Sequence, residues 1–240
     1  MIHFHGTPCG GKREDVARFL AGRHALIPFG GAEDLPTAAE VCQSFVLDNG
    51  AFSAWRSGAP IEDWRGYYEF VDKWRRHPGF DWAIIPDVID GDEDANDALL
   101  ADWPFEDCGV PVWHLHEDVY RLERLLVAYP RVALGSSGEY ADPGSRNWWR
   151  RISEAMEVAC EDGRPRAKLH GLRMLDPAIF HRLPLSSADS TNAARNGSRK
   201  AMEVGCNTLT GMTILADRIE RHQSAAKWVE RERERVFVFE

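Results

Sequence analysis

The feature that most constrains the fold of this chain is a regular alternation of short apolar runs with longer segments of helical periodicity. The apolar runs, each bounded by turn residues, predict eight strands: residues 1–5, 24–29, 44–48, 82–87, 110–116, 131–135, 167–172 and 183–188. Between most of these runs, apolar side chains recur every three or four positions, as they do from Ile61 to Trp74. That spacing is typical of amphipathic helices. Strands that alternate with helices form parallel sheets with crossover connections.

Eight alternations predict an α/β fold, and more specifically a single (β/α)₈ TIM barrel. The chain has 240 residues, of which 44% are hydrophobic, and one barrel domain of this size buries a sufficient core. We expect the barrel to occupy residues 1–206 and a helical extension, packed on the barrel, to occupy residues 207–240, with helix over 207–233. An open, doubly wound sheet is the alternative, because periodicity does not distinguish a closed sheet from an open one.

Composition and cysteine spacing argue against membrane and disulfide-rich classes. No apolar run approaches the roughly 20 residues that a helix needs to cross a bilayer. The N-terminal residues 1–5 predict a strand and lack the basic and apolar segments of a secretory signal. The five cysteines are widely separated, which predicts neither a CxxC metal site nor a disulfide framework. We therefore expect a cytoplasmic protein without a structural zinc ion.

Polar side chains gather where the predicted strands end. In barrels, chemistry is carried by the C-terminal strand ends and the loops that follow them. Such residues are Asp48 after the third strand, Asp87 after the fourth, His114 and His116 on the fifth, Gly135 to Glu139 after the sixth, His170 on the seventh and Asp189 after the eighth. We expect them to converge on one face. His114 and His116 alternate, so only one of the two is expected to face the barrel interior.

Several of these residues also fit purely structural roles. An aspartate at a strand end commonly forms a turn, and Asp189 or Ser190 would cap the helix that follows. Ser136 and Glu139 have the spacing of a capping box. The same glycine-lined segment, 135–139, equally predicts a helix start whose backbone N–H groups hold a carbonyl oxygen or an anion.

Aspartate and histidine at strand ends also suit a divalent metal ion. The first predicted strand carries His3 and His5 in alternation. Together with His170 and Asp189 they would form an amidohydrolase-like ligand set. A metal-dependent barrel hydrolase is therefore one alternative to the function favoured below.

Five sequence blocks, in order, resemble the tRNA-guanine transglycosylase superfamily, and more closely its DpdA-type DNA transglycosylases of phages and bacteria. They are Leu47 to Phe52, Pro86-Asp87, Val112 to His116, Val132 to Glu139, and Ala188-Asp189 followed by Ala194-Arg195-Asn196-Gly197. The matches extend from about residue 45 to 197. The zinc-binding cysteines of the family are absent, and His116 stands in place of a glutamine. These departures favour DNA over tRNA as the polymer, with a queuine-type tRNA-guanine transglycosylase as a further alternative.

The resemblance implies a pentosyltransferase that exchanges guanine in DNA for a 7-deazaguanine, such as 7-cyano-7-deazaguanine, without a cofactor or a metal ion. Asp189 would be the nucleophile at C1′, and Asp48 the general acid and base. The residues implied to bind the base are Asp87, His116, Gly135, Ser136, Ser137, Gly138, Glu139 and His170, with Phe52 and Trp113 as stacking partners. A phage-encoded protein of this kind would act in the host cytoplasm.

Basic residues cluster at Arg195, Arg199 and Lys200, directly after the implied nucleophile. The net charge is −9, which excludes a protein coated in positive potential, but nucleic-acid binding requires only a local basic stripe. We expect these three side chains to contact the phosphates that flank the target nucleotide.

Overall fold

The centre of the molecule is a parallel sheet that wraps into a barrel. The computed structural model describes residues 1–230. The strands of the sheet are β1 (Ile2–Gly6), β2 (His24–Pro28), β3 (Ser44–Asp48), β4 (Phe80–Ile84), β5 (Gly109–Val110), β6 (Val112–His114), β7 (Arg131–Gly135), β10 (Lys168–Gly171) and β11 (Ser187–Ser190). Their hydrogen-bonded order is β5-β4-β3-β2-β1-β11-β10-β7-β6.

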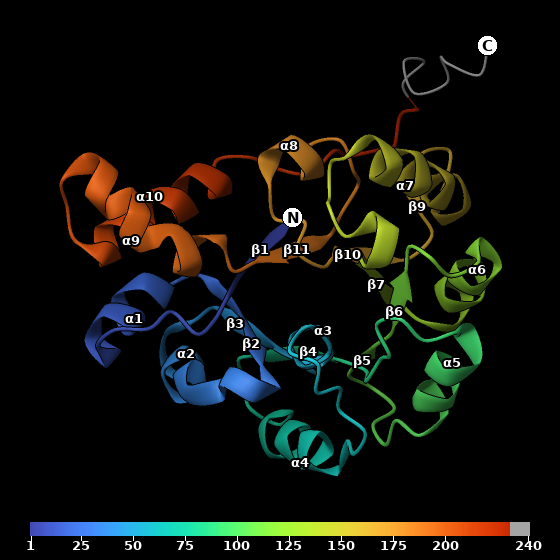
Figure 1. Ribbon diagram of the computed structural model, residues 1–240, viewed down its shortest axis with the longest axis horizontal. Helices are drawn as coiled ribbons and strands as arrows, with labels where there is room; N and C mark the ends of the chain where they lie inside the picture. Colours follow the sequence, from blue (N-terminus) through green and yellow to red (C-terminus); the bar gives the residue numbers. More distant parts are fainter. Residues whose placement is uncertain (231–240) are drawn as a thin grey trace.

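The sheet closes through β5 and β6, which are two halves of one strand. Pro111 alone separates them, and a proline has no N–H to contribute to the ladder. On one side β5 pairs with β4, and on the other β6 pairs with β7. The carbonyl of Pro111 itself accepts a hydrogen bond from Ala133 of β7 at 2.9 Å. The predicted (β/α)₈ barrel is therefore confirmed, and Figure 1 shows the strands at the centre with the helices around them.

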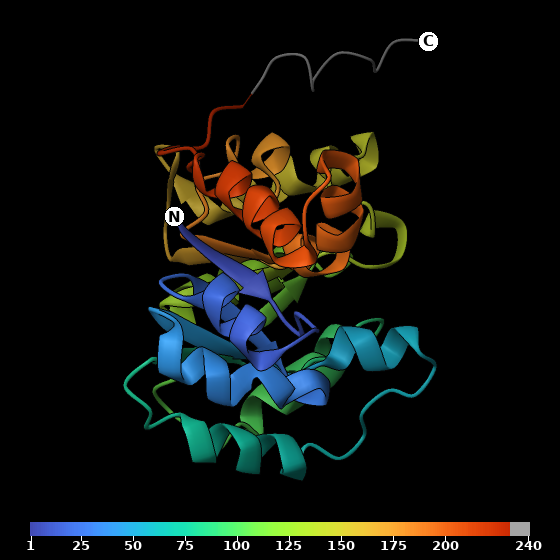
Figure 2. The same ribbon diagram turned by 90° about the vertical axis from the view of Figure 1, so that its left-hand side faces the viewer.

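Helices surround the barrel, and most of them cover its outer face (Figure 1). They are α1 (Arg13–Leu20), α2 (Leu35–Val41), α3 (Ala51–Arg56), α4 (Arg65–Trp74), α5 (Glu93–Ala101), α6 (Val119–Ala128), α7 (Arg146–Ala159), α8 (Pro177–Phe180), α9 (Asn192–Val204) and α10 (Thr208–Glu220), with 3₁₀ turns η1 (Phe29–Asp34) and η2 (Gly138–Tyr140). A short antiparallel hairpin of β8 (Cys160–Glu161) and β9 (Arg164–Pro165) follows α7. Figure 2 shows the helices of the N-terminal half below the sheet and those of the C-terminal half above it.

Apolar side chains fill both faces of the sheet. Phe4, Val46, Trp82, Ile84 and Val112 belong to a buried cluster inside the barrel, with the rings of Phe4 and Trp82 5.6 Å apart in an edge-to-face contact. Two larger clusters lie between the sheet and the helices. The barrel interior is consequently a packed core rather than a pore, so ligands must bind at its ends.

Several boundaries differ from those expected, among them strand four, which spans Phe80–Ile84 rather than 82–87, and most of all strand eight and the last helix. Strand eight begins at Ser187 rather than at residue 183, because Leu183 and Leu185 are buried in the connection that precedes it. Asp189 therefore lies within the strand. α10 ends at Glu220 rather than at residue 233, because the following segment hydrogen bonds elsewhere: Ala225 donates to Leu183 and Trp228 donates to Gly163.

The predicted extension contains α10, which packs closely against α9, and the apolar tail at 236–239 lies outside the described residues. Over residues 1–230, no helix has the length and apolar character needed to span a bilayer.

Candidate functional site

Three aspartates lie at the C-terminal end of the barrel. Asp48 is the last residue of β3, Asp87 follows β4, and Asp189 lies in β11. The side chains of Asp87 and Asp189 are buried. Burial raises the pKa of Asp48 to about 7, and the negative charges of Asp189 and Asp87 raise it further. Because both charges act on Asp48, the structure brings these three sequence-predicted carboxyl groups into one region.

The carboxylate of Asp189 is held by the loop after β10. Its Oδ1 accepts the backbone N–H of Arg173 at 2.9 Å and lies 3.4 Å from Nε2 of His170. Arg173 has a left-handed backbone with φ of 60°, which is uncommon for a residue other than glycine. This conformation directs the N–H of Arg173 toward the aspartate.

Arg173 connects three of the loops at the barrel mouth. Its guanidinium donates to the carbonyl of Ser136 after β7 and lies 4.1 Å from the centre of the Phe52 ring on α3. Burial lowers the pKa of Arg173, while the charge of Asp189 opposes that shift. The sequence analysis missed this residue, because no motif marks it.

Asp87 forms a buried cluster with Asn49 and His114. Nδ2 of Asn49 donates to Oδ1 of Asp87 at 2.6 Å and to the carbonyl of Ile85 at 2.9 Å. Nε2 of His114 lies 2.8 Å from Oδ2 of Asp87. Both oxygens of Asp87 thus already have a protein partner, so a base edge would have to share them.

The fifth strand and the turn after it place the two histidines in different environments. β6 ends at His114, and the chain then turns. The alternation of side chains between the two faces of a strand therefore does not extend to His116. Their rings stack with centroids 5.5 Å apart. His116 is exposed, with Nε2 3.0 Å from the carbonyl of Gly91. His114 is buried and contacts Asp87, whereas the exposed His116 does not share that buried position.

The glycine-rich segment after β7 forms no capping box and begins a 3₁₀ turn rather than an α-helix. Oγ of Ser136 accepts the indole N–H of Trp148 at 2.9 Å, and Oγ of Ser137 donates to Ile89 at 3.2 Å. Glu139 accepts from Asn147. Gly138 begins the short turn η2 with a positive φ. The next α-helix begins at Arg146, where Ser145 is the cap, so the backbone N–H groups of the segment lie at the start of a 3₁₀ turn rather than of an α-helix.

Gly135, the last residue of β7, allows His114 to approach. A Cβ atom at this position would lie 2.8 Å from Nδ1 of His114, which is closer than two such atoms can pack. The glycine therefore leaves room for the imidazole, and its role is steric.

The two aromatic side chains predicted to stack on a base are placed differently. Trp113 is fully buried between the sheet and the helices, and its Nε1 donates to the carbonyl of Asp118 at 3.0 Å. Its position on the outer side of the strand excludes it from the mouth, so that expectation is wrong. Phe52 lies at the mouth on α3, but Arg173 covers one face of its ring.

His170 lies inside the barrel and has no exposed surface. Burial lowers the pKa of His170, although Asp189 opposes the shift. A substrate at the mouth would reach Asp189 before His170, so the expected direct contact of His170 with a base is not supported by its placement.

The ligand set of the alternative metal site is not assembled. Because Phe4 points into the barrel, His3 and His5 point outward: His3 contacts the carbonyl of His222 at 3.0 Å and His5 contacts Glu220 at 2.7 Å. Neither lies with His170 and Asp189 on the inner face. Among the residues that the structure describes, no group of three His, Cys, Asp or Glu side chains could hold a metal ion.

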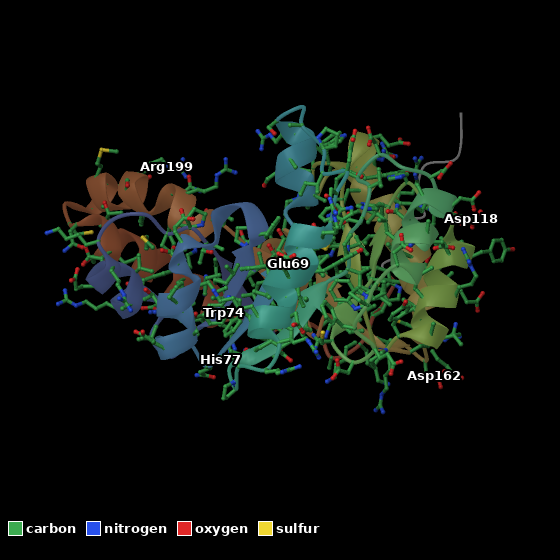
Figure 3. The ribbon with its side chains drawn as sticks, turned by 90° about the horizontal axis from the view of Figure 1, so that it is seen from below. Glu69, Trp74, His77, Asp118, Asp162 and Arg199 are labelled. Carbon is green, nitrogen blue, oxygen red and sulfur yellow. The ribbon has the colours of Figure 1, made fainter. Side chains whose placement is uncertain are left out.

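The three predicted phosphate contacts lie on α9, directly after β11. Arg195 and Arg199 are exposed and one helical turn apart, whereas Lys200 is partly buried and pairs with Glu203 at 3.1 Å. Figure 3 shows Arg199 at one end of the molecule and Asp118, at the start of α6, near the other.

A small cavity lies beside one of the three aspartates. A cavity of about 30 Å³ beside Asp87 is lined by Trp55, Ile61, Trp64 and Val88, among others, and it has room for about one water molecule. A hollow of about 690 Å³ lies at the opposite end of the barrel, beside the starts of β7 and β10. We place the candidate site at the mouth, because the carboxylates gather there.

No protein-family model matches the chain, and no curated protein matches it. Among solved structures, the chain is similar to a putative fructose-1,6-biphosphate aldolase from Coccidioides immitis, with a TM-score of 0.51, 14% identity, and coverage of 91% of this chain and 89% of the other. It is also similar to a structure of the tryptophan synthase a2b2 complex from Pyrococcus furiosus, with a TM-score of 0.48, 13% identity, and coverage of 92% and 95%. At such identities, the likeness to the aldolase supports the barrel fold alone.

Proposed function

We propose that this protein is a transglycosylase that exchanges guanine in DNA for a 7-deazaguanine base through a covalent aspartyl-glycosyl intermediate. The carboxylate pair Asp48 and Asp189 carries the proposal. Substitution at an anomeric carbon through an oxocarbenium-like state uses one carboxylate against the sugar and one carboxylic acid that handles protons. Environments that separate the protonation states of two neighbouring carboxyl groups identify the acid and the base.

Asp48 has the properties of the acid. With a pKa of about 7, its carboxyl group is substantially protonated near neutral pH. A general acid works best when its pKa lies near the working pH. The negative charge of Asp189 is part of the reason why Asp48 keeps its proton, so the two roles are coupled.

The exchange is balanced in two steps. An oxygen of Asp189 forms a bond to C1′ as the C1′–N9 bond of guanine breaks, and the proton of Asp48 goes to the departing base. The incoming base then attacks C1′ and gives a proton to Asp48, while the bond from C1′ to Asp189 breaks. The enzyme returns to its starting state, and no redox cofactor or nucleoside triphosphate is consumed.

We expect the mouth loops to move when a purine enters. The cavity of about 30 Å³ beside Asp87 is far smaller than a base, and Arg173 holds the loops after β3, β7 and β10 together. Displacement of Arg173 from Phe52 would uncover an aromatic face for a base that has left the DNA stack. The Asp87 and His114 pair would then lie at the edge of the bound base.

The decisive experiment follows label from guanine. DNA and tRNA carrying labelled guanine are incubated with the protein and 7-cyano-7-deazaguanine, and free guanine is measured. We expect release from DNA in the wild-type protein and none in Asp189→Asn, with Asp94→Asn, an exposed aspartate on α5, as the matched control. Without incoming base, a covalent protein–DNA adduct should survive denaturation in the wild-type protein only.

Three outcomes would redirect the proposal. Release from tRNA alone would assign the polymer as tRNA. Release of guanine that persists in Asp189→Asn would show that Asp189 is not the nucleophile. Binding of DNA without release or adduct in the wild-type protein would indicate a nucleic-acid-binding module.

A further inference from the structure

A chain of polar side chains runs through the barrel interior to Asp189. Nη1 of Arg131, at the start of β7, lies 3.0 Å from Oγ of Ser187 on β11. The same Oγ lies 2.9 Å from Nδ1 of His170 on β10, and Nε2 of His170 lies 3.4 Å from Oδ1 of Asp189. The strand register explains the alignment, because His170 pairs with Ser187 on the neighbouring strand.

Hydrogen-bond chemistry fixes the direction of the contact between Arg131 and Ser187. An arginine side chain only donates, so Oγ of Ser187 must accept from Arg131. The hydroxyl proton of Ser187 is then available for Nδ1 of His170. A neutral imidazole that accepts at Nδ1 carries its proton on Nε2, and that proton faces Asp189.

His170 is suited to remain neutral. It is fully buried, the edge of its ring packs against Trp82 with centroids 4.8 Å apart, and burial lowers its pKa. The 3.4 Å separation from Asp189 is long for a hydrogen bond. Within the described part of the chain, Nε2 makes no hydrogen bond, so its contact with Oδ1 of Asp189 becomes a hydrogen bond only by shortening, as such contacts often do when substrate binds.

The consequence is an asymmetric carboxylate. Both neighbours of Asp189, the N–H of Arg173 and Nε2 of His170, contact Oδ1. No hydrogen bond to Oδ2 is found among residues 1–230. The hydrogen bond from Arg173 and the contact with His170 on one oxygen orient the carboxylate and leave the other oxygen available to react.

We propose that His170 is a positioning residue, locked as the Nε2–H tautomer by Arg131 and Ser187, that fixes Oδ1 of Asp189 so that Oδ2 is the reacting oxygen. The assignment of a reaction to Asp189 rests on the proposed function. The tautomer of His170 and its contacts do not depend on the proposed function, so the tautomer and the reaction can be tested separately.

The tautomer is measured directly by long-range ¹⁵N–¹H correlation NMR on histidine-labelled protein, with His170→Gln used to assign the resonance. We expect a neutral ring with the proton on Nε2. A proton on Nδ1, or a doubly protonated ring at neutral pH, would overturn the proposal.

Two variants separate positioning from packing. Glutamine at position 170 can present an N–H close to the place of Nε2, whereas asparagine is too short to reach Asp189. We expect His170→Asn to lower kcat for base exchange about ten- to a hundredfold with little change in KM, and His170→Gln to restore most of the loss. Thermal melts of both variants verify that they fold.

Other kinetic results would contradict the proposal. A raised KM with unchanged kcat would make His170 a residue that binds substrate. An equal loss in both folded variants would show that the N–H is not what matters. If the wild-type protein exchanges no base but His170 is the Nε2–H tautomer, the proposed function fails and the interior chain stands. An active protein with the Nδ1–H tautomer gives the reverse conclusion.

Discussion

His114 and Asp87 form a buried pair at the barrel mouth, with Nε2 of the imidazole 2.8 Å from Oδ2 of the carboxylate. The two residues are 2% and 7% exposed. Asn49 completes the pair by donating to the other carboxylate oxygen. Through this pair, the ends of β3, β4 and β6 are held in one arrangement.

Removal of the Asp87 carboxylate should destabilise the fold. In Asp87→Ala, Nδ2 of Asn49 and Nε2 of His114 both lose an acceptor, and an unpaired buried donor costs about 1–3 kcal/mol. We expect the free energy of unfolding to fall by about 2–4 kcal/mol in urea titrations. The matched control is Asp90→Ala, an exposed aspartate three residues further along the chain. An equal loss of free energy of unfolding in that variant would show that the pair of Asp87 and His114 has no particular role in stability.

Asp48 should make stability depend on pH. In the unfolded chain its carboxyl group ionises near the ordinary aspartate pKa of about 3.9, whereas in the folded protein the pKa is about 7. Between these values the folded state binds more protons, so this group lowers the free energy of unfolding as pH rises. The loss of free energy of unfolding caused by Asp48 is complete above pH 7 and absent below pH 4.

Asp48→Asn removes this loss. The difference in free energy of unfolding between the variant and the wild-type protein should therefore grow with pH in favour of the variant, from near zero at pH 4 to at most about 4 kcal/mol at pH 8. Denaturant titrations at several pH values measure it. A difference that does not vary with pH would show that Asp48 ionises normally in the folded protein.

The arrangement of Glu117 and Arg121 predicts a large, non-additive effect. Nη1 of Arg121 lies 2.7 Å from Oε2 of Glu117, and both side chains are 1% exposed. Glu117 also accepts from the backbone N–H of His114 and from Asn96. Removing one partner of a buried pair leaves an uncompensated charge, so Arg121→Met should lower the free energy of unfolding by about 3–5 kcal/mol.

The matching double variant tests this explanation. Glu117→Gln combined with Arg121→Met removes the stranded charge, so the double variant should be more stable than the sum of the two single losses. Strict additivity, measured by denaturant unfolding of all four proteins, would mean that the two groups do not interact.

The sequence predicts those parts of the molecule that local residue patterns determine, and it fails where the geometry of a loop determines the structure. The strand at 44–48 is predicted to the residue, because its apolar run is short and bounded by turn residues. The sequence identifies Asp48 and Asp87 as candidate site residues for the same reason, because each lies at the end of a run of apolar residues. Pro111 divides the fifth strand without breaking the barrel, because each half pairs with a different neighbour.

Residues whose role depends on long-range contacts could not be predicted. Arg173 reaches Asp189 through a left-handed backbone conformation in a loop, and no composition signal marks that conformation. Trp113 is a different case. Because side chains alternate along a strand, an inward His114 requires an outward Trp113, so alternation contains the information that excludes the tryptophan from the mouth.

The exposed arginines of α9 are expected to contact the phosphates of DNA. Arg195 and Arg199 share one helix face, whereas Lys200 pairs with Glu203. If the two arginines contact phosphates, Arg195→Gln and Arg199→Gln should each weaken DNA binding by a similar factor for all sequences and reduce the slope of log K against log salt by about 1. Fluorescence anisotropy between about 50 and 200 mM salt measures that slope. Lys200→Gln should change it less, since the ammonium group is already paired, and an equal change in all three variants would indicate a diffuse electrostatic effect rather than two defined phosphate contacts.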